Sequence, residues 1–200
     1  MTDQPPILIH GAGGHAKVAY TVAIAAGREV IGFLDPNSPI QTLFGVPIHH
    51  SNPFRSDAEN FIAIGNNEVR KTVAERELGR FATLIHPSAI IAPEVQIGQG
   101  TLICAGTIIQ TGTTIGNHSI INTKASVDHD CKIADFVHIA PGATLCGNVT
   151  VQELALIGAG ATVIPGVTIF SRATLGAGST TLEDIHQGER WGGVPAKYLP

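Results

Sequence analysis

The sequence is poor in charged and aromatic residues and has no long apolar run. Of its 200 residues, 14% are charged and 5% are aromatic, and the formal net charge is -4. This composition lacks the excess of basic residues expected of a protein that binds nucleic acid or an anionic membrane surface. No apolar run approaches the ~18 residues of a membrane span, and residues 1–6 (MTDQPP) lack the basic and apolar regions of a signal peptide. We therefore expect a cytoplasmic protein that neither inserts into membranes nor binds nucleic acid.

Cysteine is also scarce. The three cysteines, Cys104, Cys131 and Cys146, have no metal-type spacing, and their number is odd. Both features argue against a disulfide framework and against a zinc site. We expect buried, reduced thiols and no metal ion.

What the sequence does contain is an unbroken six-residue repeat. Sixteen aliphatic residues follow one another at this spacing: Ile85, Ile91, Ile97, Ile103, Ile109, Ile115, Ile121, Val127, Ile133, Ile139, Leu145, Val151, Ile157, Val163, Ile169 and Leu175. Four residues after each of them comes a small or β-branched residue, from Ala89 to Ser179. Neither a helix period nor a strand alternation keeps a six-residue phase over ~90 residues, so this is a hexapeptide repeat.

The repeat predicts a left-handed parallel β-helix in which each aliphatic residue points inward. Three hexads make one triangular coil, so sixteen hexads correspond to about five coils of 18 residues. Burial of each aliphatic side chain contributes roughly 1.5–3 kcal/mol before entropy is counted. We predict a β-helix domain over residues 85–200 that includes a C-terminal cap.

Residues 1–84 predict a small α/β lobe of the Rossmann type. A short apolar strand (residues 7–10) is followed by the glycine-rich segment GAGGHAK (residues 11–17), a helix-like run (residues 18–26) and a second strand that ends at Asp35. Glycines between a strand and a helix let the backbone approach a phosphate, which the free N–H groups of the helix N-terminus hold. This order predicts a nucleotide site.

The candidate nucleotide-binding residues share one position in the predicted lobe. Gly13, Gly14, His15, Asp35 and Gly65 all fall at the carboxyl ends of strands, where parallel sheets bind their ligands. The lobe is too short for a full two-halved dinucleotide fold. A nucleoside diphosphate is therefore favoured over NAD.

The best catalytic candidate in the repeat is the pair His129 and Asp130, at a coil corner. A histidine beside a carboxylate is the usual general base, because the acid orients the ring and stabilises the imidazolium. A solvated polar corner is the alternative. His138 lies half a coil away and should emerge on another side, so we hypothesise that the two histidines cooperate across a subunit interface. His118 has no acid beside it and is expected at the surface.

Six segments carry a resemblance to a known family: residues 11–15 (GAGGH), 65–71 (GNNEVRK), 122–123 (NT), 127–131 (VDHDC), 138–139 (HI) and 146–148 (CGN). They resemble the nucleotide-amino-sugar acetyltransferases typified by the bacillosamine-pathway enzyme PglD. The wider relatives include the NeuD sialic acid O-acetyltransferases and the perosamine N-acetyltransferases. Residues 192–197 (GGVPAK) also resemble the closing G-x-P-A-K segment of hexapeptide acyltransferases.

The resemblance implies a homotrimer that uses acetyl-CoA to acetylate the 4-amino group of a nucleotide-linked 4-amino-4,6-dideoxy sugar. A UDP-sugar is favoured, for glycan or glycoprotein biosynthesis. In this family His129 matches the general base, and Asp130 matches an acidic neighbour that raises its basicity and is glutamate in PglD. Residues that match acetyl-CoA contacts are His138, Gly147, Ala159, Ala177 and Lys197, and the Gly147 amide is also a candidate oxyanion donor. Residues that match the sugar-nucleotide site are Gly13, Gly14, His15, Asp35, Pro36 and Gly65.

Four alternative functions follow from the same residues. A sialic acid-type O-acetyltransferase would keep the chemistry but change the acceptor. A non-catalytic nucleotide-binding scaffold would use the repeat only as structure. A hexapeptide-fold carbonic anhydrase would need three histidines on one metal ion, and His118, His129 and His138 are widely spaced for that. An NAD oxidoreductase is disfavoured by the short first lobe.

Overall fold

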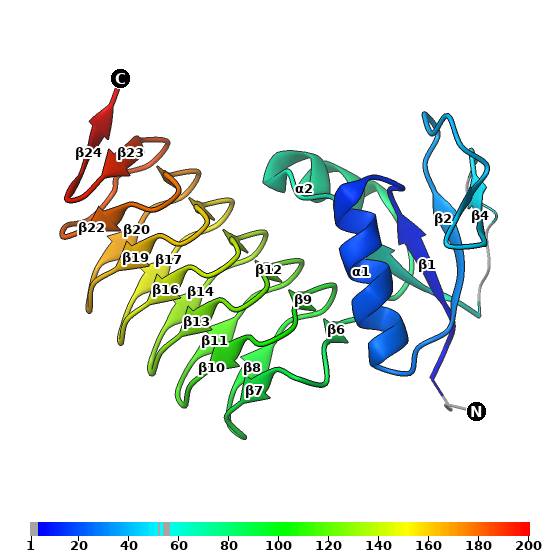
Figure 1. Cartoon of the computed structure of the whole chain (residues 1–200), viewed down its shortest axis with the longest axis horizontal. Helices are drawn as coiled ribbons and strands as arrows, with labels where there is room; N and C mark the ends of the chain where they lie inside the picture. Colours follow the sequence, from blue (N-terminus) through cyan, green and yellow to red (C-terminus); the bar gives the residue numbers. More distant parts are fainter. Residues whose placement is uncertain (1–3, 52, 54–56) are drawn as a thin grey trace.

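A computed structural model describes residues 4–51, 53 and 57–200 and consists of a small α/β lobe joined to a β-helix (Figure 1). The elements of the lobe are β1 (Ile7–His10), α1 (Gly14–Ala25), β2 (Val30–Leu34), β3 (Thr42–Leu43), β4 (Val46–His49), β5 (Glu59–Ile62) and α2 (Asn67–Arg76). The sheet order is β3-β4-β2-β1-β5, and only the β3–β4 pair is antiparallel. The helix α1 begins earlier than the predicted run, because the extended residue Gly13 already ends the glycine loop.

The β-helix is built from strands of two residues each. They are β6 (Leu84–Ile85), β7 (Ile90–Ile91), β8 (Gln96–Ile97), β9 (Leu102–Ile103), β10 (Ile108–Ile109), β11 (Thr114–Ile115), β12 (Ile120–Ile121), β13 (Ser126–Val127), β14 (Lys132–Ile133), β15 (His138–Ile139), β16 (Thr144–Leu145), β17 (Thr150–Val151), β18 (Leu156–Ile157), β19 (Thr162–Val163), β20 (Thr168–Ile169), β21 (Thr174–Leu175) and β22 (Thr180–Thr181). Two longer strands, β23 (Arg190–Gly193) and β24 (Ala196–Leu199), follow. The predicted division at residue 84 falls inside β6 and stays a prediction.

The left-handed parallel β-helix is confirmed, but the predicted number of coils is wrong. The three faces carry eight, six and five strands, so the stack extends beyond five coils. The extra strands β22 to β24 follow Leu175, where the aliphatic repeat ends. Thr181 takes the next inward position, because its hydroxyl donates to the Glu183 carbonyl at 2.7 Å and is thereby satisfied inside the coil.

The inward aliphatic residues form one continuous core. From Ile103 to Leu175 each of them is at most 4% exposed. Ile85 is 37% exposed, and Ile91 and Ile97 are only partly buried. These three belong to the first coil, which has no further coil beneath it.

Several of the small residues of the repeat also act as hydrogen-bond donors inside the coils. Thr101, Thr113 and Ser119 are buried, and each hydroxyl donates to the backbone carbonyl 15 residues later, at 2.8 to 2.9 Å. Cys131 makes the corresponding contact through its thiol, to the Cys146 carbonyl at 3.2 Å. These bonds satisfy polar backbone groups at the coil corners.

All three cysteines are free thiols, as predicted, but one of them is not buried. Cys104 and Cys131 are fully buried, whereas Cys146 is half-buried. Both Cys104 and Cys146 directly follow an inward residue, but only Cys104 belongs to the core cluster that contains residues of the lobe.

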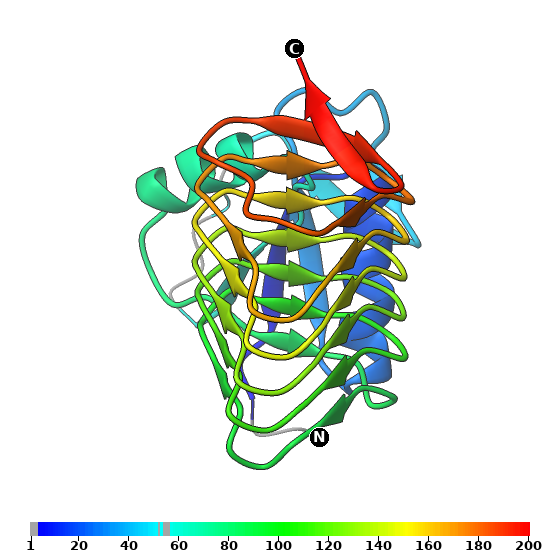
Figure 2. The same ribbon diagram turned by 90° about the vertical axis from the view of Figure 1, so that its left-hand side faces the viewer.

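The lobe packs on one face of the β-helix, which we call the lobe face: the sheet that contains β6, β9, β12, β15, β18 and β21. Leu84, Leu102 and Ile120, which point outward from this face, join the same core cluster as Ala16 and Ala19 of α1. In Figure 2 the lobe accordingly lies behind the stacked coils. The cover of the lobe explains why these three outward positions are apolar.

The three edges of the triangular coils are marked by residues with left-handed backbone, 18 residues apart. The α2 edge contains His118, Phe136, Leu154 and Arg172, the alanine edge contains Gly142, Gly160 and Gly178, and the histidine edge contains Gly112, Asp130 and Gly166. The lobe face connects the α2 edge with the alanine edge, since β12 lies between residues 118 and 124. The histidine edge is therefore the edge of the prism opposite the lobe face.

Helix α2 runs along the α2 edge and is fastened to it by side chains of successive turns. Asn67 donates to the Leu154 and Ala155 carbonyls at 3.0 Å each, and Lys71 pairs with Glu153 at 2.7 Å. Arg172 in turn reaches Glu68 at 2.7 Å. The lobe is thus attached to several coils at once.

Arg70 is the central contact of this helix and is only 1% exposed. Its guanidinium donates to the carbonyls of His118 at 2.7 Å, Phe136 at 3.0 Å and Ile64 at 2.8 Å. Burial lowers the pKa of Arg70 to about 9, so it stays charged at pH 7. One cation thereby joins two coil corners to the end of β5.

His118 is buried beneath this contact, which corrects the expectation of a surface histidine. It is 5% exposed, and its ring stacks on Phe136 and meets Phe81 edge-on, with centroid distances of 5.2 and 4.6 Å. The lobe covers this corner, and a sequence pattern of coil corners cannot show what packs over one of them.

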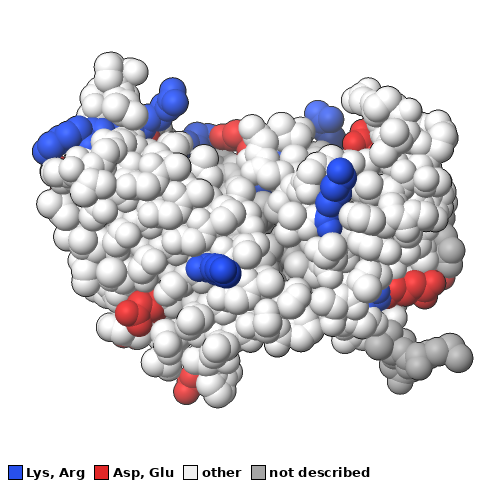
Figure 3. Space-filling view, in the orientation of Figure 1, with Lys and Arg blue, Asp and Glu red and all other residues white. Residues whose placement is uncertain are grey.

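The surface offers no basic patch on the face seen in Figure 3, where charged side chains are scattered over a mostly uncharged surface. Neither of the helices in the described ranges has the length and apolar character that a membrane crossing requires.

Replacement of Arg70 by methionine should destabilise the protein strongly. The buried carbonyls of His118 and Phe136 would lose their donor, and each unsatisfied buried group costs about 1–3 kcal/mol. We expect a loss of about 2–5 kcal/mol in urea unfolding. The matched control is Arg76→Met on the exposed side of the same helix, which should change stability little. Equal effects of the two variants would contradict the role of Arg70.

Candidate functional site

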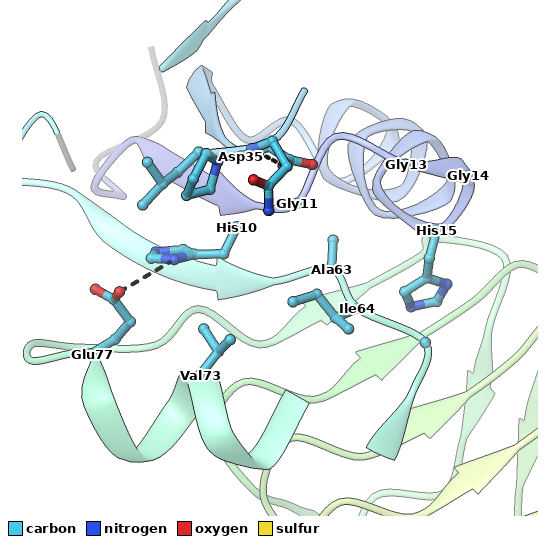
Figure 4. Close-up of a pocket in the computed structure, with 14 residues that line it drawn as sticks. His10, Gly11, Gly13, Gly14, His15, Asp35, Ala63, Ile64, Val73 and Glu77 are labelled. Atoms are coloured by element: carbon cyan, nitrogen blue, oxygen red, sulfur yellow. Dashed lines mark hydrogen bonds and ion pairs between the residues drawn. The ribbon is translucent and has the colours of Figure 1, made fainter. Parts of the chain in front are cut away.

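A cavity of about 500 Å³ lies at the carboxyl ends of β1, β2 and β5 (Figure 4). All six residues predicted for a sugar nucleotide line it: Gly13, Gly14, His15, Asp35, Pro36 and Gly65. Val73 and Glu77, in α2 and just after it, form the opposite wall. The structure therefore brings the predicted residues together.

The glycine loop leaves one end of this cavity open for an anion. A Cβ atom added at Gly13 or Gly14 would meet nothing within 4 Å, and Gly11 has a φ of +100° that favours glycine. The first turn of α1 carries no acidic side chain, and its N–H groups have no intrahelical partner. Such a helix start attracts phosphate groups.

Asp35 shapes the loop at the end of β2. Its carboxylate accepts hydrogen bonds from the Ala12 amide at 3.0 Å and from the Asn37 amide at 3.1 Å. These bonds hold the glycine loop and residues 35–37 together. A carboxylate has further acceptor capacity, so it can also receive the hydroxyl groups of a ribose.

His15 and His138 meet where the lobe touches the β-helix, with their ring centroids 6.2 Å apart. Asn122 Nδ2 lies 3.1 Å from His138 Nε2, and its Oδ1 accepts the Thr123 amide at 2.8 Å. Since that amide can only donate, the orientation of Asn122 is fixed, and Nε2 of His138 must be the acceptor. His138 is therefore held as a neutral ring.

The charge state of both histidines agrees with this arrangement. Burial, followed by the nearby Arg70 cation, lowers the pKa of His15 and of His138 to about 4. The Nε2 atom of His15 is buried and has no hydrogen-bond partner among the described residues. His15, which lines this end of the cavity, and the neighbouring His138 therefore both stay uncharged at pH 7.

His129 and Asp130 lie at the histidine edge, and both are exposed. His129 Nδ1 is 2.9 Å from Asp130 Oδ2. The carboxylate can only accept, so Nδ1 carries the proton and Nε2 has the free lone pair. The hydrogen bond to Asp130 raises the pKa of His129, and the charge of Asp128 adds to the effect. This is the arrangement of a general base.

Gly147 supports the His129 ring from the next coil. A Cβ atom added at Gly147 would lie 2.5 Å from both Cε1 and Nε2 of His129, so only glycine leaves room for the ring. The Asn148 amide also donates to the His129 carbonyl at 2.8 Å. The backbone at Gly147 is therefore beside the nitrogen that would accept a proton.

The other residues matched to acetyl-CoA contacts lie elsewhere on the chain. Ala159 and Ala177 are exposed and stacked at the alanine edge, where the Gly178 amide donates to the Ala159 carbonyl at 2.8 Å. Lys197 is exposed on β24. His138 lies on the lobe face, away from the histidine edge. Within one chain the predicted acetyl-CoA residues do not converge.

The three histidines of the carbonic anhydrase alternative do not converge either. His118 is buried at the α2 edge, His129 is exposed at the histidine edge, and His138 lies on the lobe face. Among residues 4–51, 53 and 57–200, no three His, Cys, Asp or Glu side chains form a group that could hold a metal ion.

Sequence reasoning missed four residues of the site region. Arg70 and Asn122 fall in segments that carry the family resemblance, but their contacts depend on how the lobe sits on the β-helix. His10 and Glu77 line the cavity from the end of β1 and from beyond α2. The position of His10 at the end of a strand was the one available signal.

Comparisons with known proteins agree with this architecture. A family model described as the PglD N-terminal domain matches residues 6–76. GDP-perosamine N-acetyltransferase from Escherichia coli O157:H7 is 33% identical over 72% of this chain and 63% of its own length. UDP-N-acetylbacillosamine N-acetyltransferase from Bacillus subtilis (strain 168) is 41% identical over 48% of this chain and 50% of its own length. The chain thus matches half to two thirds of these curated relatives.

Several solved structures match almost the whole chain, among them a PglB domain and PerB. The acetyltransferase domain of PglB from Neisseria gonorrhoeae FA1090 has a TM-score of 0.93 and 36% identity, and the match covers 98% of this chain and 100% of that chain. PerB from Caulobacter crescentus, in complex with CoA and GDP-perosamine, has a TM-score of 0.92 and 35% identity, with 98% and 97% covered.

The buried histidines predict a loss of stability in mild acid. Burial lowers the pKa of His15, His118 and His138 to about 4, whereas an unfolded chain keeps values of about 6.5. The unfolded state therefore binds protons first as the pH falls. Stability should be fully present above pH ~6.5 and decline progressively to pH ~4.

His118→Phe tests this directly, because phenylalanine keeps the stacking but cannot take up a proton. As the pH falls over this range, the free energy of unfolding of the variant in urea should decrease less steeply than that of wild type. The two slopes should differ by up to about 1.4 kcal/mol per pH unit. The exposed His50→Phe is the matched control. If His118→Phe and wild type showed the same slope, the buried ring would not be titrating as described.

Proposed function

Because the chain belongs to the PglD/NeuD-like family of nucleotide-amino-sugar acetyltransferases, we propose that it transfers the acetyl group of acetyl-CoA to an amino group of a nucleotide-linked sugar. The observation that carries the proposal is His129, a histidine oriented by Asp130 at 2.9 Å and backed by Gly147. Three relatives are N-acetyltransferases or acetyltransferase domains by name. They favour nitrogen over the hydroxyl acceptor of a sialic acid-type enzyme.

The sugar nucleotide occupies the cavity of the lobe in this proposal. Its diphosphate lies at the N-terminus of α1, against Gly13 and Gly14, and its ribose hydroxyls bond to Asp35. The amino sugar then extends toward His15 and His138. The uncharged nitrogens there can hydrogen-bond to the ring substituents without placing a positive charge beside the sugar amine.

In the chemical step, His129 Nε2 takes a proton from the sugar amine as the amine attacks the acetyl carbonyl. Asp130 stabilises the imidazolium that forms, and such a base contributes about 10² to 10⁴ in rate. The Gly147 N–H is the candidate donor for the oxyanion. The proton on His129 can then pass to the leaving thiolate of coenzyme A.

A complete site requires two chains in this proposal. The cavity is associated with the lobe face, and His129 lies at the opposite edge of the prism. A homotrimer resolves this separation, because the histidine edge of one subunit can approach the lobe of the next. Acetyl-CoA would lie along that interface, where Ala159, Ala177 and Lys197 are its candidate contacts.

The acceptor is, more finely, the 4-amino group of a 4-amino-4,6-dideoxy sugar, and the family likeness favours UDP as its nucleotide. One curated relative carries UDP in its name and another carries GDP. A cytoplasmic location also stays a prediction.

His129→Ala should abolish acetyl transfer without loss of substrate binding. We expect kcat to fall by about 10² to 10⁴, measured as thiol release from acetyl-CoA with UDP-, dTDP- and GDP-linked 4-amino sugars. The matched control is His186→Ala, an exposed histidine of the C-terminal segment. No thiol release by wild type with any sugar would refute the proposed reaction and favour the scaffold alternative. Full activity of His129→Ala would show that His129 is not the general base.

The pH profile should report the His129–Asp130 pair. Catalysis needs neutral His129, so kcat/KM should rise with pH through the pKa of His129, which Asp130 raises above its usual value. Asp130→Asn removes the carboxylate and should shift this limb to lower pH while lowering the plateau. If the acidic limb of the pH profile stayed at the same pH in Asp130→Asn, then Asp130 would not be raising the pKa of the catalytic base.

A further inference from the structure

The cavity has a second polar end, opposite the glycine loop. In Figure 4, His10 and Glu77 lie together at the side away from Gly13, Gly14 and His15. The distance between His10 Nδ1 and Glu77 Oε1 is 3.8 Å, and the two side chains are 4% and 22% exposed. Both residues line the cavity. An imidazole and a carboxylate thus form a polar wall that is largely shielded from water.

Neighbouring groups fix the orientation of His10. Its Nε2 atom is 2.9 Å from Asn60 Oδ1, while Asn60 Nδ2 donates to the Leu78 carbonyl at 3.2 Å. The second bond assigns the amide oxygen of Asn60 to the histidine, so Nε2 of His10 is the donor. Nδ1 is therefore the atom on the side of Glu77, and the pair is held at the cavity wall rather than in solvent.

The length of the cavity determines what this wall would meet. With a diphosphate at the start of α1 and a ribose at Asp35, the base of the nucleotide falls at the end formed by His10 and Glu77. Residues 34–37 bound this end on one side and Val73 on the other. This placement rests on the proposed function, namely on a sugar nucleotide in the cavity.

A carboxylate distinguishes the nucleobases by the donors that they present. Guanine offers two adjacent N–H groups, N1–H and the 2-amino group, which one carboxylate can accept together. Uracil and thymine offer one N–H between two carbonyl oxygens, and those oxygens repel a carboxylate. Adenine presents its amino group next to an acceptor nitrogen. The carboxylate therefore matches guanine.

We propose that Glu77 reads the nucleobase and selects guanine. The substrate class is then a GDP-linked amino sugar, in place of the UDP-sugar that the family likeness favours. Glu77 is a specificity-determining residue and takes no part in the acetyl transfer itself.

The test is calorimetric binding of GDP, IDP and UDP to the full chain. IDP lacks only the 2-amino group of GDP, so this comparison probes the carboxylate without any mutation. We expect wild type to bind GDP about tenfold or more tightly than IDP, and more tightly than UDP. Glu77→Gln replaces one acceptor by a donor and should bring GDP and IDP to within about twofold. Glu75→Gln, an exposed neighbour, should leave the preference unchanged.

Two outcomes would overturn the proposal. Equal affinity of wild type for GDP and IDP, or tighter binding of UDP than of GDP, refutes guanine selection by Glu77 but leaves a nucleotide site intact. Binding of none of the three nucleotides refutes the sugar-nucleotide site as well. The comparison of GDP with IDP stands even if Glu77→Gln fails to fold.

Discussion

The buried guanidinium of Arg70 is the contact on which the rest of the arrangement depends. The lobe docks on the β-helix through an apolar cluster and through polar contacts of α2. The most deeply buried of these polar side chains is Arg70, which donates to the coil corners at His118 and Phe136 and to the end of β5 at Ile64. No carboxylate is among these partners. Carbonyl groups from both parts of the chain solvate the cation. Loss of these hydrogen bonds would leave buried polar groups unsatisfied and would strongly lower the free energy of unfolding.

Three features of the site follow from this contact. Helix α2 is held as a wall of the cavity, which places Val73 and Glu77 opposite the glycine loop. The lobe is pressed onto the face that bears His138, so that His15 meets it. The positive charge also keeps the nearby histidines neutral, because it lowers their pKa in addition to burial. One ionic group thus helps to position a wall of the cavity and adds to the effect of burial on its charge.

The β-helix could be predicted from the sequence because its signal is periodic. Each coil repeats the same inward residue, as from Val127 to Leu145, so the pattern itself encodes the fold. The grouping of the candidate nucleotide residues around one cavity could be predicted for a related reason, since loops after parallel strands converge at one edge. The stack length could not, because Thr181 continues the core with a residue that breaks the aliphatic pattern. The burial of His118 and the contacts of Arg70 could not either, since they exist only once the lobe is docked.

The geometry of the prism separates the cavity from His129, so in the proposed function a complete site combines residues from two chains. The most direct test mixes two inactive variants. His129→Ala keeps the cavity. Gly14→Leu keeps His129 but fills the phosphate end, where an added Cβ atom meets nothing within 4 Å. Co-refolded at equal amounts, they should recover about a quarter of wild-type activity, because one in four neighbouring pairs joins an intact cavity to an intact His129. A mixture as inactive as either variant alone would show that each site is built within a single chain.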